Sequence, residues 1–243
     1  MTRAVDVAAG TGAGVASGRM AGEARRQQIL GVAMRLFSQH GFRGTTTREI
    51  AQGAGVSEAM VFRHFATKEE LYRAILDHKA CVGGLDPCQL LGAAIARKDD
   101  RAVFETLALA MMRHHEQDTE FMRLLSHAAL EEHQLVELFF DRNVRQMYEL
   151  LGGYIRERQR DGAFRAVAPA VAVRAFLGMI IHHSLNNTLW DKRRSLLDIP
   201  NERAAQEFTN IILGGITVAP NIKPKRSVTT AATAPTRKQK GSK

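Results

Sequence analysis

The chain has 243 residues, of which 45% are hydrophobic and 24% are charged; this balance is typical of an ordinary globular protein that can bury a core. Its formal charge of +9 is mostly local, because residues 221–243 contain seven Lys or Arg and no acidic residue, which argues against a large charged enzyme cleft. The two cysteines are too few for a disulfide framework and lack companions at zinc-site spacing, so neither a metal nor a cofactor is expected.

The two ends of the chain differ in composition from the rest. Residues 1–22 are rich in Gly and Ala and lack the continuous apolar core of a signal peptide, so they are predicted to form a disordered leader. Residues 220–243 have few apolar side chains and are predicted to be a basic disordered tail. The most apolar run, 175–190, is interrupted by two His and two Asn before it reaches the ~20 residues of a membrane span. We therefore expect a soluble, cytoplasmic protein without a membrane partner.

The first predicted helix covers residues 23–40. Its apolar residues recur at helical spacing, which gives the helix one buried face; they are Ile29, Val32, Ala33, Leu36 and Phe37. Gly41 follows directly and suits the C-terminus of that helix.

Two short helices are predicted next, in the stretch "IAQGAGVSEAMVFRHF" and just before it. Thr46 followed by Glu49 forms a capping box that begins one helix, and Ser57 can cap the other. Gly55 lies between them, where a backbone with positive φ would cost a residue with a Cβ roughly 1–2 kcal/mol. Thr67 and Glu70 repeat the capping pattern before a fourth helix. Two short helices joined by a tight turn predict a helix-turn-helix, whose second helix enters the major groove of DNA.

Helical spacing continues through the rest of the chain, and no strand pattern occurs. Further helices are predicted near 87–97, 99–116, 118–131, 133–161, 168–190 and 200–215. The predicted fold class is therefore all-α, with about nine to ten helices. A three-helix helix-turn-helix DNA-binding domain is predicted over 23–83, with its motif at 46–65, and a helical bundle is predicted over 84–219.

The segment "ILGVAMRLFSQHGFRGTTTREIAQGAGVSEAMVFRHFATKEELYRAIL" resembles the DNA-binding domain of the TetR repressor family, over residues 25 to about 78. The resemblance rests on many positions at fixed offsets: Ala33, Phe37, Gly41, Thr46, Ile50, Ala51, Ala54, Gly55, Val56, Ser57, His64, Phe65, Lys68 and Leu71. The bundle at 84–219 resembles the effector-binding and dimerisation domain of the family only in the number and length of its helices, and the resemblance implies those two roles for it.

The resemblance implies contacts to DNA at the front of both short helices. Thr47 would bind a phosphate and Arg48 would reach a base edge, where Arg suits guanine. On the recognition helix, Glu58 could accept a hydrogen bond from cytosine, and Met60 could contact only an apolar group such as a thymine methyl.

The resemblance also implies phosphate contacts from His64 and Lys68. Two residues depart from the family pattern: Ala59 stands where Gly is usual, and Phe62 stands where Tyr is usual. Because Phe62 has no hydroxyl, one expected phosphate anchor is missing. The full set of expected DNA-binding residues is Thr46, Thr47, Arg48, Ser57, Glu58, Ala59, Met60, Phe62, Arg63, His64 and Lys68.

Two His-His pairs, in "MMRHHEQD" and "MIIHHSLNN", suggest a further site. Adjacent helical residues project about 100° apart, so one pair cannot chelate an ion unaided. Polar groups among apolar ones mark a ligand pocket, a subunit interface or a satisfied core hydrogen bond, and all three remain open. An effector pocket would use Met111, Met112, His115, Phe140, His182 and Asn186. No nucleophile–base or carboxylate constellation accompanies the histidines, so no enzyme is expected.

In the resembled family the last two helices pair with their copies. The corresponding apolar residues here, expected at a homodimer interface, are Ala175, Leu177, Ile181, Phe208, Ile211 and Ile212. Two hypotheses follow. One is a homodimeric repressor that leaves a palindromic double-stranded DNA operator when an unknown small-molecule effector binds. The other is a constitutive DNA-binding or architectural protein whose bundle only dimerises and whose basic tail adds non-specific affinity.

Overall fold

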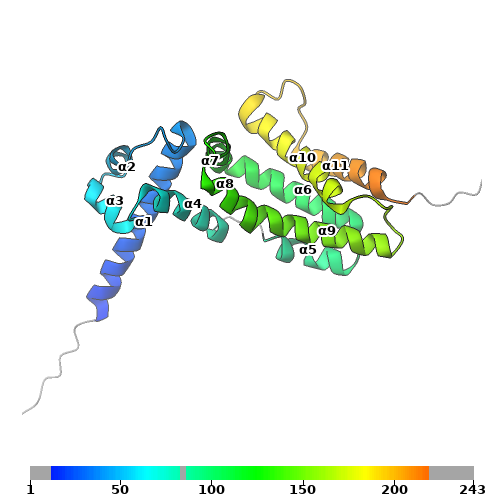
Figure 1. Ribbon diagram of the computed structural model, residues 1–243, viewed down its shortest axis with the longest axis horizontal. Coiled ribbons are helices and arrows are strands. Elements are labelled where there is room, and N and C mark those ends of the chain that lie inside the picture. Colours follow the sequence, from blue (N-terminus) through cyan, green and yellow to red (C-terminus); the bar gives the residue numbers. More distant parts are fainter. Residues whose placement is uncertain (1–11, 83–85, 219–243) are drawn as a thin grey trace, which may run out of the picture.

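The computed structural model describes residues 12–82 and 86–218, with side chains for 22–79 and 86–218. Across this part of the chain the fold is all-helical, which confirms the predicted class (Figure 1). The α-helices are α1 (Gly12–His40), α2 (Thr47–Gly53), α3 (Glu58–His64), α4 (Lys68–Val82), α5 (Pro87–Ala96), α6 (Asp100–Gln117), α7 (Thr119–Leu130), α8 (Gln134–Phe139), α9 (Arg145–Arg160), α10 (Pro169–Leu185) and α11 (Asn201–Ile216). Two π-helical segments, η1 (Phe140–Val144) and η2 (Asn186–Trp190), extend α8 and α10.

None of these helices combines the length and the apolarity that crossing a bilayer would require.

Local capping rules position the ends of the N-terminal helices as expected. Thr46 accepts a hydrogen bond from the Glu49 N–H, and the Glu49 carboxylate accepts one from the Thr46 N–H at 2.7 Å, which completes the capping box. The Ser57 hydroxyl accepts from the Met60 N–H at 3.2 Å and begins α3. Gly55 has a φ of +61°, the left-handed conformation that favours glycine.

The first helix begins earlier than the sequence analysis predicts. Its backbone is helical from Gly12, so the prediction of a disordered leader is wrong for residues 12–22. Residues 1–11 of that leader and the basic tail from residue 219 lie outside the described residues.

The described part of the chain contains two hydrophobic cores, and their boundary differs from the predicted domain boundary at residue 83 (Figure 1). One core joins α1–α4 to α7 and α8, through residues that include Phe121, Leu124 and Leu135. The other joins α5, α6, α9, α10 and α11. Helices α7 and α8 thus pack with the helix-turn-helix, although they follow it by more than forty residues.

The predicted helix at 133–161 is interrupted where it passes from one core to the other. Leu135 belongs to the first core and Met147 to the second, and η1 lies between them. A π-turn adds one residue to a helical turn and rotates the side chains that follow. The predicted helix at 168–190 likewise ends in a π-segment, η2.

Candidate nucleic-acid interface

The helix-turn-helix is braced from beneath by α1. The Gln28 side-chain amide donates a hydrogen bond to the Ala54 carbonyl at 3.0 Å, which satisfies a backbone acceptor at the turn. The guanidinium of Arg26 lies 5.0 Å from the centre of the Phe65 ring, within the range of a cation–π contact. Both contacts come from α1, and the sequence analysis did not predict either of them.

The residues expected to bind DNA lie together on α2, α3 and their connections, at one end of the molecule (Figure 1). Most are exposed: Thr46, Arg48, Ser57, Glu58, Ala59, Phe62 and Arg63. Val61 and Phe65 of the same short stretch are buried. The apolar residues thus pack against α1 and α4, and the polar face remains exposed to solvent.

Side chains on this face also contact one another. The Thr47 hydroxyl donates a hydrogen bond to the Glu58 carboxylate, which ties the start of α2 to the start of α3. The Arg63 guanidinium contacts the sulfur of Met60. If Thr47 binds a phosphate and Glu58 accepts from a cytosine, their mutual hydrogen bond must first break. Arg48 is exposed on α2 and can reach a base edge without such an exchange.

Lys68 is placed differently from the expected phosphate contact. Its ammonium donates a hydrogen bond to the Phe42 carbonyl and lies 4.2 Å from the centre of the Phe42 ring. Burial lowers the pKa of Lys68, while nearby carboxylates oppose that shift. Because the ammonium is used inside the protein, Lys68 is a structural residue in this conformation. His64 is half-buried, and its Nε2 has no hydrogen-bond partner among the described residues, so a phosphate contact there also requires movement.

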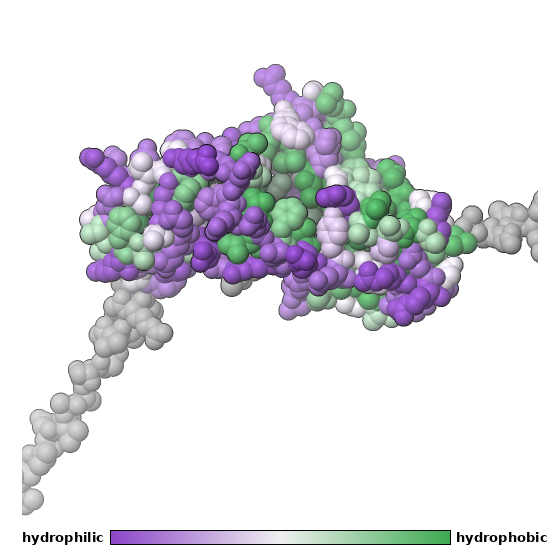
Figure 2. Space-filling view, viewed as in Figure 1, coloured by the Kyte–Doolittle hydropathy of each residue, from purple (hydrophilic) through white to green (hydrophobic). Residues whose placement is uncertain are grey.

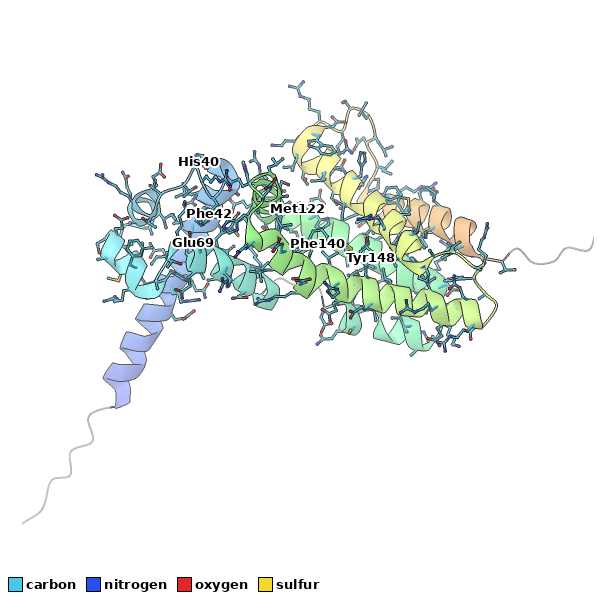
Figure 3. The ribbon with its side chains drawn as sticks, viewed as in Figure 1. His40, Phe42, Glu69, Met122, Phe140 and Tyr148 are labelled. Atoms are coloured by element: carbon cyan, nitrogen blue, oxygen red, sulfur yellow. The ribbon has the colours of Figure 1, made fainter. Side chains whose placement is uncertain are left out.

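A junction between α1 and α7 connects the helix-turn-helix to the rest of the molecule, and the sequence analysis missed it. The Glu131 carboxylate, just after α7, accepts hydrogen bonds from the N–H groups of Phe42 and Arg43 at 3.0 and 3.3 Å. Gly41 makes this approach possible, because a Cβ there would lie 2.2 Å from Glu131 Oε1. The His133 ring packs against the Phe42 ring in a tilted arrangement, with centroids 4.4 Å apart. Figure 3 labels Phe42 at this junction, beside the end of α1.

The six residues expected to form an effector pocket are not gathered into one site. Met112 is buried in the second core, whereas Phe140 and His182 are exposed. Asn186 donates a hydrogen bond to the His182 ring at 2.9 Å on the surface of α10. Met111 is partly buried against the second core. Phe140 instead borders an open hollow on α8 and η1 that Val136, Glu137 and Asp141 also line.

One histidine of each pair is hydrogen-bonded inside the protein. His115 is largely buried and its Nδ1 is hydrogen-bonded to the Ser184 hydroxyl at 3.0 Å; burial lowers its pKa to about 4, with a smaller effect of His114. His183 is buried, and its Nε2 is hydrogen-bonded to the Asn187 amide at 3.0 Å. Both rings therefore have hydrogen-bond partners within the chain. This agrees with the core hydrogen bond, one of the three interpretations given above.

The six residues expected at a dimer interface divide into two groups. Ala175, Ile181 and Ile211 are exposed, as an interface requires. Leu177 and Ile212 are buried in the second core of their own protomer, and Phe208 is partly buried against that core. The assignment of Leu177 and Ile212 to the interface is therefore corrected. The apolar residues of α11 therefore lie on two sides of the helix. Ile212 faces the core of its own protomer, and Ile211 faces solvent.

Residues 29–75 match the family described as bacterial regulatory proteins of the tetR family. Residues 29–75 therefore carry the TetR-family sequence pattern. The transcriptional repressor KstR2 of Mycobacterium tuberculosis is 42% identical over 60 residues, which are 24% of this chain and 30% of that protein. The match thus spans about three tenths of the length of that relative.

Similarity of fold extends further along the chain. NalD, the secondary repressor of a multidrug efflux pump in Pseudomonas aeruginosa, superposes with a TM-score of 0.63 at 23% identity, over 82% of this chain and 98% of NalD. AibR, solved in complex with isovaleryl coenzyme A and operator DNA, gives a TM-score of 0.57 at 22% identity, over 77% of this chain and 97% of AibR. At these identities the likeness concerns the fold: a TetR-type domain followed by a helical bundle.

Proposed function

We propose that this protein is a transcriptional repressor that binds a pseudo-palindromic double-stranded operator as a homodimer, with one α3 helix in each half-site. The observation that carries the proposal is the open polar face of α2 and α3, braced by α1 and with Arg48, Glu58 and Ala59 exposed. In this proposal Arg48 and the front of α3 read bases, and Thr46, Thr47 and Ser57 position the backbone.

Dimer formation is proposed through the outer faces of α10 and α11. Ala175, Ile181 and Ile211 are exposed there without covering side chains from the same protomer. A two-fold axis makes such a patch meet its own copy. Two recognition helices on one side of DNA must then lie roughly 34–36 Å apart, or a multiple of that distance.

Release by a small-molecule effector is part of the proposal, supported by AibR, which was crystallised with both an acyl coenzyme A and its operator. In this chain α7 and α8 share a core with the TetR-type domain, so a ligand that moves them also moves α3. The packing of Met112 in the bundle core favours a second candidate, a constitutive DNA-binding protein whose bundle only dimerises. Either protein would act in the cytoplasm, where bacterial DNA lies.

Selection from a pool of random DNA duplexes tests the proposal. We expect the full chain to enrich a motif with two inverted half-sites whose centres are about one helical turn apart. Enrichment of a single half-site would overturn the dimeric reading, and no enrichment above a bovine serum albumin control would overturn sequence-specific binding. Retention of the enriched duplex against a panel of acyl coenzyme A esters then separates the effector-released repressor from the constitutive protein.

A further inference from the structure

Exposed large hydrophobic side chains are concentrated near the C-terminal end of the described chain. Ten such residues occur among the described residues, and seven of them lie between residues 171 and 218: Val171, Ile181, Trp190, Leu196, Leu197, Ile211 and Val218. Monomeric proteins rarely leave such a group in water unless another molecule covers it. Figure 2 shows hydrophobic surface over α10 and over the loop that follows it.

The loop between η2 and α11 is held in one shape by its own hydrogen bonds. The Asp191 carboxylate accepts from the Ser195 hydroxyl and from the Leu196 N–H, both at 2.9 Å. Arg194, in the left-handed conformation with a φ of +52°, pairs with Glu116 of α6 at 2.9 Å. Glu116 also accepts a hydrogen bond from Asn201 at 2.8 Å, where α11 begins. The loop is thus anchored at both ends and in its middle.

This anchoring holds three apolar side chains outward. Trp190, Leu196 and Leu197 have exposed fractions of 65, 85 and 51%. The Trp190 ring contacts His182 on the outer face of α10, with centroids 5.8 Å apart. The apolar surface of the loop therefore continues the outer face of α10, on which Ile181 is also exposed.

A stable dimer needs more apolar surface than short helical faces rich in glycine provide. A standard interface buries ~800 Å² and involves roughly 20–30 residues on each partner. The outer faces of α10 and α11 include Gly178, Gly214 and Gly215, around which a Cβ would meet open space. Glycines let two helices approach closely but contribute little apolar area. The loop adds large apolar side chains to Ile181 and Ile211 of these faces, and hot spots of interfaces are enriched in Trp.

We propose that the loop from Trp190 to Ile199 is an arm that packs on the second copy of this chain and completes the dimer interface. The proposal rests on the dimer described under Proposed function, because α10 and α11 must first bring two copies together. The partner surface is the equivalent outer face of α10 and α11, since a two-fold axis places each arm against the other protomer.

Trp190 is the only tryptophan in the chain, so its fluorescence reports the arm directly. The full-length protein is titrated from nanomolar to micromolar concentration at pH 8, and its mass is followed by mass photometry and light scattering. We expect emission to shift to the blue and acrylamide quenching to fall over the same concentrations at which mass doubles. A dimer in which Trp190 emission and quenching equal those of the monomer overturns the arm but keeps the dimer. A chain that stays monomeric at every concentration overturns both.

Matched leucine variants provide a second measurement. The double variant Leu196→Ser/Leu197→Ser should raise the dissociation constant of the dimer at least about tenfold, because side chains buried at an interface centre dominate its affinity. Leu130→Ser is the control, since Leu130 is 84% exposed at the end of α7 and outside this patch; it should change the constant less than about twofold. All three leucines are exposed, so circular dichroism should report an unchanged fold. Equal dissociation constants for the double variant and the control would overturn the arm.

Discussion

The ammonium of Lys68, the first residue of α4, is partly buried against the loop that follows α1. Its Nζ lies over the rings of Phe42 and Phe37, at 4.2 and 5.9 Å from their centres, and donates to the Phe42 carbonyl. A desolvated cation on an aromatic face contributes up to about 2 kcal/mol. The position of Lys68 in the sequence motif does not predict this contact, because the contact depends on where the loop after α1 places Phe42.

Replacing Lys68 with Met should therefore act on stability and not on phosphate binding. We expect Lys68→Met to lower the free energy of unfolding by about 1–2 kcal/mol, through loss of the cation–π contact and the hydrogen bond. The salt dependence of DNA binding should be unchanged. The matched variant Arg48→Met should instead weaken binding to the selected site by about 1–3 kcal/mol and relax the preference at one base pair. A smaller slope of log affinity against log salt for Lys68→Met would show that Lys68 does contact a phosphate.

The buried imidazole of His115 makes stability depend on pH. Its pKa is lowered to about 4 by burial, whereas in the unfolded chain it is near the ordinary 6.5. Below pH 6.5 the unfolded chain therefore takes up the proton first, and the stability contributed by neutral His115 is lost as pH falls from 6.5 towards 4.

Urea unfolding at pH 7.5 and pH 5 measures this contribution. The wild-type chain should lose ~2 kcal/mol more than His115→Gln between the two pH values, by linkage from these two pKa values. The variant retains the other histidines, including His183, whose pKa burial also lowers. Equal losses for both proteins would show that His115 titrates normally in the folded chain.

Local and distant interactions position the helices in different ways. The starts of α2 and α3 were predictable because each cap acts over three residues: Thr46 pairs with Glu49, and Ser57 accepts from the Met60 N–H. The junction of Glu131 with Phe42 was not, because its partners are 89 residues apart and no short pattern connects them. The break at η1 was also missed, since its residues continue an acceptable helical sequence.

Removing the Glu131 carboxylate should loosen the TetR-type domain from α7. Glu131→Ala leaves the N–H groups of Phe42 and Arg43 without this acceptor, which should cost about 1–3 kcal/mol of unfolding free energy. Glu137→Ala, an exposed carboxylate on α8, is the control and should change stability by less than about 0.5 kcal/mol. Hydrogen exchange at residues 42 and 43 localises the effect. Unchanged exchange there in Glu131→Ala would contradict the junction.

At the scale of the whole molecule, two cores meet across η1 and the α6–α7 turn. Asp118 lies in that turn, caps α7 through the Phe121 N–H at 3.1 Å and pairs with Lys79 of α4 at 2.5 Å. The helices were predictable from the sequence, but the predicted domains followed chain order, with a boundary at residue 83. In the structure, α7 and α8 pack with α1–α4 instead. The sequence likewise did not determine which apolar residues of α11 face their own protomer. Helical periodicity identifies an apolar face, but it does not identify the surface against which that face packs.

Adjacent isoleucines on α11 separate folding from assembly. Ile212 is 7% exposed and Ile211 is 61% exposed. Glu at position 212 would bury a charge, so Ile212→Glu should unfold the bundle. Ile211→Glu should leave the helix content and melting temperature nearly unchanged but yield monomers by light scattering. A dimeric Ile211→Glu protein would move the interface away from α11.

The claim that the open face of α2 and α3 binds DNA is tested most directly by removing its charge. Arg48→Ala/Arg63→Ala takes two arginines from this face, and Arg35→Ala/Arg73→Ala takes two exposed arginines from α1 and α4. Affinity for the selected duplex is measured by fluorescence anisotropy at 150 mM salt, a concentration near physiological. The first pair should weaken binding at least about tenfold and the second less than about threefold, because base and phosphate contacts from this face are each worth ~1–3 kcal/mol. Equal losses for the two pairs, or no loss for the first, would contradict the account.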